Sequence, residues 1–493
     1  MIFESFKALR NSAPHSSAFL IAAGDRALPI SWRTFTDDID AVAHVIRKFA
    51  PGATIAILGE NSYEWMVAHA AILFSGAVAL PLDTALSADE IAQRLKFAKA
   101  SVLLYSALYE ETAHRVARLC PGLGTGGLGS PKTDKYLSAA RKAIAGGEAS
   151  VWDAPSIDSE RVAMLVFTSG TTAEPRAVEL TISGIEGFSL WGAKCLPMDA
   201  GDHSLMLLPL YHIFGICSAY LMLTQGVAIG VCPDFRRIYD AVKRFKADFL
   251  FLVPALAEIL AQKIRQKGDS VEAVFGRPIR WILTGGAALA RRTYENLTEL
   301  GARMLTAYGL TETSASFAIM PYSEPPSFGA QGKVAELEGV EAKVAENGEL
   351  LVKAPFVMKG YYKMPERTAL AIDADGFFHT GDLGRIDERG YVYITGRASR
   401  TIVLSSGKKV SPEEMEEKLV SLPGILEAVV SGEGESREIR AEVYSRLSQS
   451  TVEREIGELN LSMPVYKRIK TIIVRQTPFP RTSSGKIQCR SVV

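Results

Sequence analysis

The chain alternates short apolar runs with stretches of helical periodicity through its first 330 residues. Residues 53–59 and 77–82 are apolar runs of strand length. Residues 62–75, which lie between them, suit a buried helix with Asn61 as its cap. Strand and helix signals in this order indicate βαβ units, whose strands lie parallel. We therefore expect an α/β fold in which mostly parallel sheets are covered by helices.

Two neighbouring stretches differ in their local signals: one predicts a capped helix and the other a connection. Residues 86–100 have helical periodicity, with Ser87 at the N-cap position and Glu90 where a capping box requires it. Residues 121–134 are rich in glycine but lack the helix signal and the acidic partner of a dinucleotide-binding fingerprint. We interpret residues 121–134 as a flexible connection.

A second series of strands and helices follows the first. Strands are expected within residues 205–210, 228–232, 249–254, 279–286 and 303–313, the last running into a polar turn. Ser169, Gly286 and Thr311 each follow a strand signal. Ligands of open α/β sheets gather where loops leave the carboxyl ends of strands. We therefore expect one crevice to collect the three loops.

The pattern changes to strand periodicity near residue 330. Alternation of period two across Asn347 and Gly348 predicts a hairpin, and residues 378–397 repeat that signal. These features indicate a β-rich subdomain at about 330–395. Residues 397–493 contain a helix with Ser411 and Glu414 as a capping box. Because 493 residues exceed one compact core, we expect an N-terminal domain over 1–396 and a small α+β domain over 397–493.

Composition excludes several classes of protein. The 55 basic and 55 acidic residues give no net charge, which argues against nucleic acid as a partner. The cysteines are scattered and the histidines lack metal-ligand spacing, so we expect reduced thiols, a cytoplasmic location and no structural zinc. Glycine and proline interrupt the apolar runs 65–82 and 205–231. We therefore expect no membrane span.

The stretch from Phe167 to Thr181, FTSGTTAEPRAVELT, has the character of an anion-binding loop. A strand signal leads directly into Thr168, Ser169, Gly170, Thr171 and Thr172. Glycine permits close approach of backbone N–H groups, and hydroxyls add donors without bulk. The stretch is not a Walker A loop, because Pro175-Arg176 stands where Gly-Lys would fall. Taken alone, the stretch favours a solvated turn between a strand and a helix.

Eight motifs in a fixed order supply a resemblance. They are FTSGTTAEPRAVELT, LPLYHIFG, LTGGAALA, AYGLTETSA, GELLVKAPFVMKGYYKMPERT, FHTGDLGRID, GR followed by TIVLSSGKKVSPEEMEE, and PRTSSGKIQCR. Together they resemble the adenylate-forming (AMP-binding) superfamily, and in form they are most similar to fatty acyl-CoA synthetases. The resemblance implies a large N-terminal domain and a mobile C-terminal lid domain with a hinge near Ser399. It also implies AMP-forming activation of a carboxylic acid by ATP and Mg²⁺, followed by transfer to the thiol of CoA.

The resemblance also implies a role for each matched residue. Thr168, Ser169, Gly170, Thr171 and Thr172 would hold the β- and γ-phosphates, Thr311 the α-phosphate, and Glu312 the Mg²⁺. The adenine and ribose would meet Gly286, Ala287, Tyr308, Gly309, Asp382 and Arg397. Lys486 would act on the developing phosphate charge, and His212 would border the carboxylate pocket. Taken singly, Glu312, Asp382, Lys486 and His212 are also consistent with a turn cap, a helix cap, a tail lysine and a core histidine.

The prediction for the acyl-binding part of the site depends on small residues. Gly285, Gly286, Ala287, Ala288 and Ala307, with Phe214 nearby, would leave an apolar channel. The matched stretches offer no cation for an amino-acid carboxylate, which favours a fatty or aryl acid, and the motif form favours a medium- or long-chain fatty acid. Two alternatives stay open: an acyl–acyl carrier protein ligase that uses a phosphopantetheine arm, and a nucleotide-binding regulatory homologue with weak catalysis.

Four positions depart from the family pattern. The loop has Ala173, Arg176 and Ala177 where the family usually has Gly, Lys and Gly. Arginine keeps the charge but presents a planar fork instead of a point charge. Ser399 stands where the hinge usually carries Asp or Lys. A hinge must only absorb a change of backbone angles, so serine is compatible with it.

Overall fold

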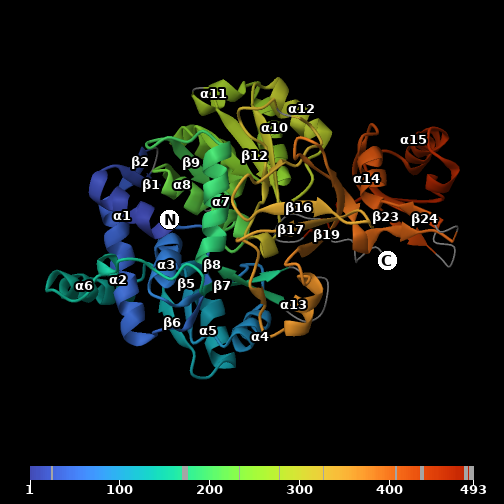
Figure 1. Cartoon of the computed structure of the whole chain (residues 1–493). Coiled ribbons are helices and arrows are strands. Elements are labelled where there is room, and N and C mark those ends of the chain that lie inside the picture. The colour runs from blue at the N-terminus through green and yellow to red at the C-terminus, as the bar shows by residue number, and fades with distance from the viewer. Residues whose placement is uncertain are drawn as a thin grey trace.

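The computed structural model describes residues 1–23, 26–168, 176–232, 234–276, 278–325, 327–405, 408–433, 438–481 and 487. Three sheets that contain parallel strands form a large body, and the C-terminal residues with α14 and α15 lie to one side of it (Figure 1). The predicted α/β fold with a smaller C-terminal unit is confirmed.

The largest sheet has seven strands in the order β18-β8-β7-β4-β3-β5-β6. Its members are β3 (Thr54–Leu58), β4 (Val78–Pro81), β5 (Val102–Tyr105), β6 (Gly124–Gly127), β7 (Val162–Thr168), β8 (Arg176–Thr181) and β18 (Gly360–Tyr361). The five strands from β6 to β7 run parallel. β8 is antiparallel to β7, and the edge strand β18 is antiparallel to β8. The hydroxyl-rich stretch therefore joins two antiparallel strands.

One connection predicted from glycine content is wrong. Residues 121–134, expected to be a flexible connection, contain β6, which pairs in parallel with β5. The glycines serve packing, since a Cβ on Gly126 would come within 3.0 Å of the Leu104 side chain. Small residues at a sheet edge thus resemble a loop when read from the sequence alone.

Two further sheets complete the large body. One has the order β2-β1-β10-β9 and the other β11-β12-β13-β14-β15. Their strands are β1 (Ser17–Ala23), β2 (Arg26–Ser31), β9 (His203–Met206), β10 (Ala228–Val231), β11 (Phe249–Leu252), β12 (Trp281–Gly285), β13 (Met304–Tyr308), β14 (Ala318–Ile319) and β15 (Lys333–Val334). In the part of the chain that the structure describes, no helix is both long and apolar enough to cross a bilayer.

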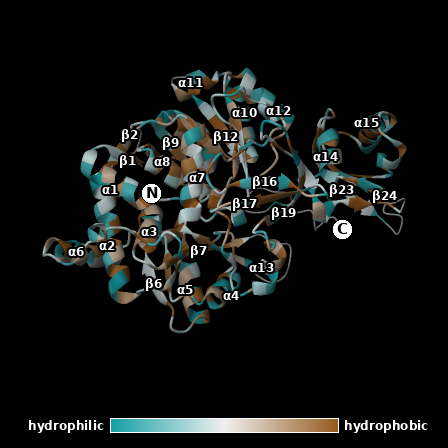
Figure 2. Cartoon of the chain, in the orientation of Figure 1, coloured by the Kyte–Doolittle hydropathy of each residue, from teal (hydrophilic) through white to brown (hydrophobic). Residues whose placement is uncertain are grey.

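Helices cover these sheets, and those on the periphery carry both hydrophilic and hydrophobic residues (Figure 2). They are α1 (Ile2–Ser12), α2 (Trp32–Phe49), α3 (Tyr63–Phe74), α4 (Ala88–Ala98), α5 (Glu110–Leu119), α6 (Pro131–Ala145), α7 (Ile182–Cys195), α8 (Ile213–Thr224), α9 (Ile238–Phe245), α10 (Pro254–Lys267), α11 (Val271–Phe275), α12 (Arg291–Glu299) and α13 (Pro365–Ala371). The predicted capping box of Ser87 and Glu90 is confirmed at the start of α4.

The predicted cap of α3 is wrong by one residue. Ser62, not Asn61, accepts the hydrogen bond from the N–H of Trp65. Asn61 instead donates to the carbonyl oxygens of Met206 and Leu208 and accepts from the N–H of Leu210. Asn61 therefore fixes the segment that leads from β9 to α8.

An antiparallel sheet, β16-β17-β19-β20, follows the large body in sequence. Its strands are β16 (Glu341–Val344), β17 (Glu349–Lys353), β19 (Phe378–Ile386) and β20 (Val392–Arg397). Both predicted hairpins are confirmed, the first by pairing of β16 with β17 and the second by pairing of β19 with β20.

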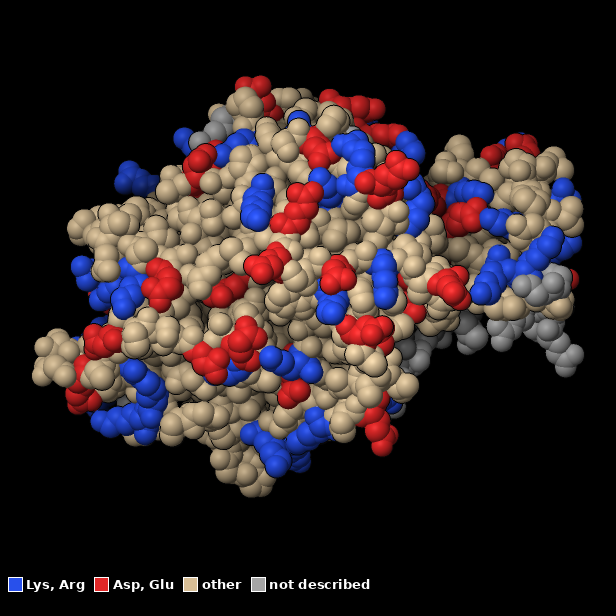
Figure 3. Space-filling view, in the orientation of Figure 1, with Lys and Arg blue, Asp and Glu red and all other residues tan. Residues whose placement is uncertain are grey.

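The C-terminal residues pack around a core of their own. They form β21 (Ile402–Val403), β22 (Lys409–Val410), β23 (Ile425–Glu433), β24 (Glu438–Ser445), β25 (Thr471–Arg475), α14 (Pro412–Val420) and α15 (Gln449–Leu461). Ser411 caps α14 as predicted, but Glu414 pairs with Lys418 and Lys467 instead of completing the capping box. Basic and acidic side chains are interspersed over the face in Figure 3, in keeping with the balanced composition.

Candidate active site

Two adjacent strands deliver the first part of the site. β12 and β13 are parallel and in register, with Gly285 opposite Ala307, so Gly286 and Tyr308 leave the same edge of the sheet. Gly286 has φ +80°, a left-handed backbone that favours glycine, and both Gly286 and Ala287 are exposed. The structure therefore gives these residues an open position at the strand ends.

The polar turn after β13 is tightly packed. A Cβ on Gly309 would lie 1.7 Å from the carbonyl oxygen of Ala315, so only glycine fits there. Thr311 and Glu312 belong to a single 3-10 turn, Thr311–Thr313. The hydroxyl of Thr313 accepts from the N–H of Leu310 at 2.9 Å and so fixes the turn.

Glu312 has a partner that the sequence did not suggest. The hydroxyl of Tyr361 donates to Oε1 of Glu312 at 2.9 Å, and the N–H of Met358 donates to the Glu312 carbonyl at 2.8 Å. Burial, followed by the charge of Glu312, raises the pKa of Tyr361 well above its ordinary value. The phenol therefore stays a neutral donor throughout the physiological pH range.

The surroundings of Glu312 fit a magnesium ion. Mg²⁺ prefers oxygen ligands and commonly binds one or two carboxylates together with substrate phosphates. Glu312 is half-buried, and its second oxygen, Oε2, accepts no hydrogen bond from the residues that the structure describes. This carboxylate can therefore offer one oriented oxygen to a cation.

Asp382 joins Tyr308 and Arg397 in a buried cluster. Oδ2 of Asp382 accepts from the Tyr308 hydroxyl at 2.6 Å, and Oδ1 lies 2.7 Å from Nε of Arg397. The pairing of β19 with β20 sets Asp382 opposite Arg397, which explains why the two side chains meet. Burial and then the Asp382 charge raise the pKa of Tyr308.

The contacts in this cluster affect how Asp382 could bind the ribose hydroxyls. The side chain of Asp382 is 5% exposed, and each of its oxygens already has one donor. A ribose hydroxyl can therefore reach Asp382 only by sharing the carboxylate with these partners or by displacing one of them. Arg397, with a side chain 41% exposed, is the partner that has room to move when a ligand enters.

The ends of the hydroxyl-rich stretch are connected to Glu312. Thr168 closes β7 opposite Arg176, which opens β8. β8 then pairs with β18, where Tyr361 lies opposite Val178. Ser169, Gly170, Thr171, Thr172, Ala173 and Lys486 lie outside the described residues. Ala177 is fully buried opposite Phe167, so this departure from the family pattern is accommodated as an ordinary strand residue.

His212 is the residue before α8, and Phe214 follows within its first turn. The Phe214 ring occupies the space that Gly285 leaves, since a Cβ on Gly285 would lie 3.2 Å from its Cζ atom. Phe188 and Phe251 meet the ring edge-on, with centroids 6.4 and 6.3 Å away. The predicted apolar channel is therefore narrow beside Gly285.

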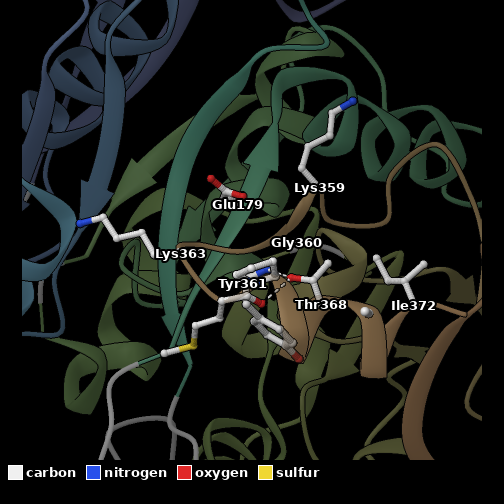
Figure 4. Close-up of a pocket in the computed structure, with 10 residues that line it drawn as sticks. Glu179, Lys359, Gly360, Tyr361, Lys363, Thr368 and Ile372 are labelled. Atoms are coloured by element: carbon white, nitrogen blue, oxygen red, sulfur yellow. Dashed lines mark hydrogen bonds between the residues drawn. The ribbon is translucent and has the colours of Figure 1, made fainter.

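A pocket of about 550 Å³ lies along β8, β18 and α13 (Figure 4). Glu179, Tyr361 and Thr368 line it, and burial raises the pKa of Glu179. Lys359 and Lys363 extend to opposite sides in Figure 4. Because the lining includes neither Glu312 nor Asp382, the pocket borders the candidate site instead of containing it.

Sequence reasoning missed Tyr361 and the bond between Tyr308 and Asp382. Tyr361 lies in the motif KGYYKMPERT, but two adjacent tyrosines carry no sign of which one reaches Glu312. Tyr308 was expected to line the adenine slot, and its position in β13 is compatible with that role. Among the other described residues, Gly286 and Ala287 follow β12, and Tyr308 ends β13 ahead of Gly309, Thr311 and Glu312. Asp382 and Arg397 pair across β19 and β20, and Thr168 ends β7.

Two family profiles together match most of the chain. The profile of the AMP-binding enzyme family matches residues 10–362, and that of the AMP-binding enzyme C-terminal domain matches residues 399–493. The 2-succinylbenzoate–CoA ligase of Geobacillus kaustophilus is 30% identical over 81% of this chain and 79% of that protein. The long-chain-fatty-acid–CoA ligase FadD15 of Mycobacterium bovis is 28% identical over 78% of this chain and 71% of that protein.

Solved structures resemble the whole chain. ATP-bound MatB from Rhodopseudomonas palustris has a TM-score of 0.85 at 27% identity, covering 100% of this chain and 98% of that chain. Apo MatB from the same organism has a TM-score of 0.76 at 26% identity, covering 100% and 97%. The likeness is therefore greater to the nucleotide-bound form of that protein than to its empty form.

Proposed function

The chain belongs to the AMP-binding enzyme family, and we propose that the acid it activates is a medium- or long-chain fatty acid. As an AMP-forming acid–thiol ligase, it uses ATP with Mg²⁺ to form an acyl-adenylate and transfers the acyl group to CoA. The observation that carries the assignment of its site is the hydrogen bond between Glu312 and Tyr361, because the strand of Tyr361 pairs with β8, which leaves the hydroxyl-rich stretch.

In the first half-reaction two anions must meet. A carboxylate oxygen of the acid forms a bond to the α-phosphorus of ATP, and the bond to the leaving pyrophosphate breaks. Mg²⁺, when bound, neutralises phosphate charge. Glu312 would hold the cation, Thr311 would donate to the α-phosphate, and Lys486 would stabilise the developing charge as a flexible cation.

The nucleoside would lie between the two strand ends and the Asp382 cluster. Gly286, Ala287 and Gly309 present little side chain, so a flat base can approach the backbone there. Asp382 would accept from the ribose hydroxyls when Arg397 moves aside or shares the carboxylate with them. In the second half-reaction the thiol of CoA attacks the acyl carbonyl and AMP leaves.

The nature of the acid rests on the surroundings of Phe214. Phe188, Phe214 and Phe251 form an apolar wall with Gly285, and none of these four residues carries a negative charge for the ammonium group of an amino acid. This supports a fatty acid. The same wall favours a second candidate, an aryl acid, because Phe214 offers a ring edge and face for stacking.

The proposal is tested by measuring pyrophosphate release with ATP, Mg²⁺ and acids of graded chain length, beside benzoate- and cinnamate-type acids. We expect the highest kcat/KM with a fatty acid of medium or long chain. A preference for aryl acids would replace the first candidate by the second. Supplying holo acyl carrier protein in place of CoA then identifies the thiol, because a carrier-specific ligase would form product only with the protein.

A further inference from the structure

Tyr361 is held on both its side chain and its backbone. Its hydroxyl donates to Oε1 of Glu312 at 2.9 Å, and its side chain is largely buried. Its N–H donates to Oγ1 of Thr368 at 2.9 Å, and that hydroxyl donates in turn to the Met364 carbonyl. The first turn of α13 therefore fixes Tyr361 before any ligand binds.

The short segment around Tyr361 also connects Glu312 to β8. The N–H of Met358 donates to the Glu312 carbonyl at 2.8 Å. On the other side, the N–H groups of Lys359 and Tyr362 donate to the carbonyls of Glu179 and Ala177. The backbone and the carboxylate of Glu312 are thus both held by a segment that is paired with the strand leaving the hydroxyl-rich stretch.

We propose that Tyr361 is a positioning residue for the cation that accompanies ATP, an inference that rests on the proposed function of Glu312. A glutamate side chain has three rotatable bonds, and ordering it costs conformational entropy. The Tyr361 hydroxyl fixes Oε1, so Oε2 is presented in one direction to an incoming Mg²⁺. Partners of metal-ligating carboxylates commonly tune metal affinity in this way.

The adjacent tyrosine provides a matched control. Tyr362 packs its ring against Phe97 and Lys363 and shares the backbone pairing with β8. Removing the hydroxyl of Tyr362 therefore tests the loss of a phenol in this segment without touching Glu312. Thr368→Val is a second, milder variant, because it removes the hydroxyl that fixes the Tyr361 backbone and leaves the side chain in place.

The experiment measures binding, so that the identity of the acid does not matter. Calorimetry of the full chain gives the affinity for ATP with Mg²⁺ and the affinity for ATP in EDTA, and the ratio of the two reports the contribution of the cation. For Tyr361→Phe we expect this ratio to fall about three- to tenfold, the effect of one hydrogen bond to a charged group. Affinity in EDTA should stay unchanged, Tyr362→Phe should retain the wild-type ratio, and Thr368→Val should shift it less in the same direction.

The outcomes separate this inference from the proposed function. If the wild-type chain binds ATP no better with Mg²⁺ than in EDTA, the role given to Glu312 fails. If the wild type shows the Mg²⁺ effect and Tyr361→Phe and Thr368→Val both keep it, Tyr361 has only a structural role and the inference is overturned. A fall in affinity in EDTA equal to that with Mg²⁺ would also overturn it.

Discussion

His69 illustrates how one buried residue sets the response of the fold to pH. It lies in α3, stacks on Trp65 and forms a 2.8 Å hydrogen bond from Nδ1 to the hydroxyl of Tyr220 in α8. Burial lowers the pKa of His69 to about 3. The folded chain therefore keeps this imidazole neutral at pH values where the unfolded chain, with a pKa near 6.5, binds a proton.

The consequence is a loss of stability in mild acid. Between pH 6.5 and 3 the unfolded state carries the extra proton, so the free energy of unfolding falls as the pH falls, by up to about 1.4 kcal/mol per pH unit. His69→Gln should lose part of this dependence while lowering stability at pH 7. Urea unfolding at pH 7, 6 and 5 measures the slope. The exposed His15 is the control, and an equal change of slope in His15→Gln would refute the assignment.

The proposed function makes Phe214 the residue that limits the size of the acid. Its ring fills the space beside Gly285, so Phe214→Ala should admit longer or bulkier acids. We expect the ratio of kcat/KM for a long acid over a short one to rise about tenfold, which is within the range for opening an apolar pocket by a few methylenes. Gly285→Ala, which adds a Cβ against the ring, should move the ratio the opposite way. An unchanged ratio in both variants would place the acyl group elsewhere.

At the scale of elements, local signals identified most of the fold. The capping box at Ser87 and the hairpin at Asn347 depend on residues within a few positions of each other, and both are confirmed. Asn61 and Glu414 were misassigned because their partners, the segment after β9 and Lys467, lie far away in sequence. Tertiary hydrogen bonding outweighed local capping at these positions.

In the candidate site, too, local motifs could be recognised from the sequence, whereas contacts between distant residues could not. Gly286, Thr311 and Asp382 were recognisable because each stands in a motif that resembles the family pattern. The contacts of Asp382 with Tyr308 and of Glu312 with Tyr361 join residues that are 74 and 49 positions apart in the chain, so no local pattern encodes them. The sequence could therefore name the candidate chemical groups but not the side chains that orient them.

The close packing of the turn after β13 leads to a prediction about that whole turn. Gly309→Ala would set a Cβ 1.7 Å from the Ala315 carbonyl, so the turn carrying Thr311 and Glu312 must shift. We expect loss of measurable ATP binding by calorimetry and a destabilisation of at least about 2 kcal/mol. Gly457 in α15 is the control, because a Cβ there meets nothing within 4 Å and alanine should stabilise the helix by about 0.5–1 kcal/mol. Wild-type ATP affinity in Gly309→Ala would contradict this account.

At the scale of the molecule, the question is what holds the C-terminal unit in its observed orientation. Ser411 donates to the carbonyl oxygen of Thr395 in β20 at 2.6 Å. A Cβ on Gly396 would lie 2.7 Å from both Ser411 and Glu413, so the start of α14 is packed closely against β20. Since the whole chain resembles ATP-bound MatB more than apo MatB, we propose that this contact favours an arrangement of the chain that reacts with ATP.

Ser411→Asp tests that inference while keeping the helix cap. Aspartate accepts from the N–H of Glu414 as serine does, but as a carboxylate it cannot donate to Thr395 and it repels Glu413. We expect pyrophosphate release to slow about three- to tenfold, and thioester formation from a supplied acyl-adenylate to stay unchanged. Ser448→Asp, at the cap of α15, should affect neither rate. Equal losses in both half-reactions would mean that the contact between Ser411 and Thr395 stabilises the fold in general. A loss of pyrophosphate release alone would mean that the contact stabilises the arrangement that reacts with ATP.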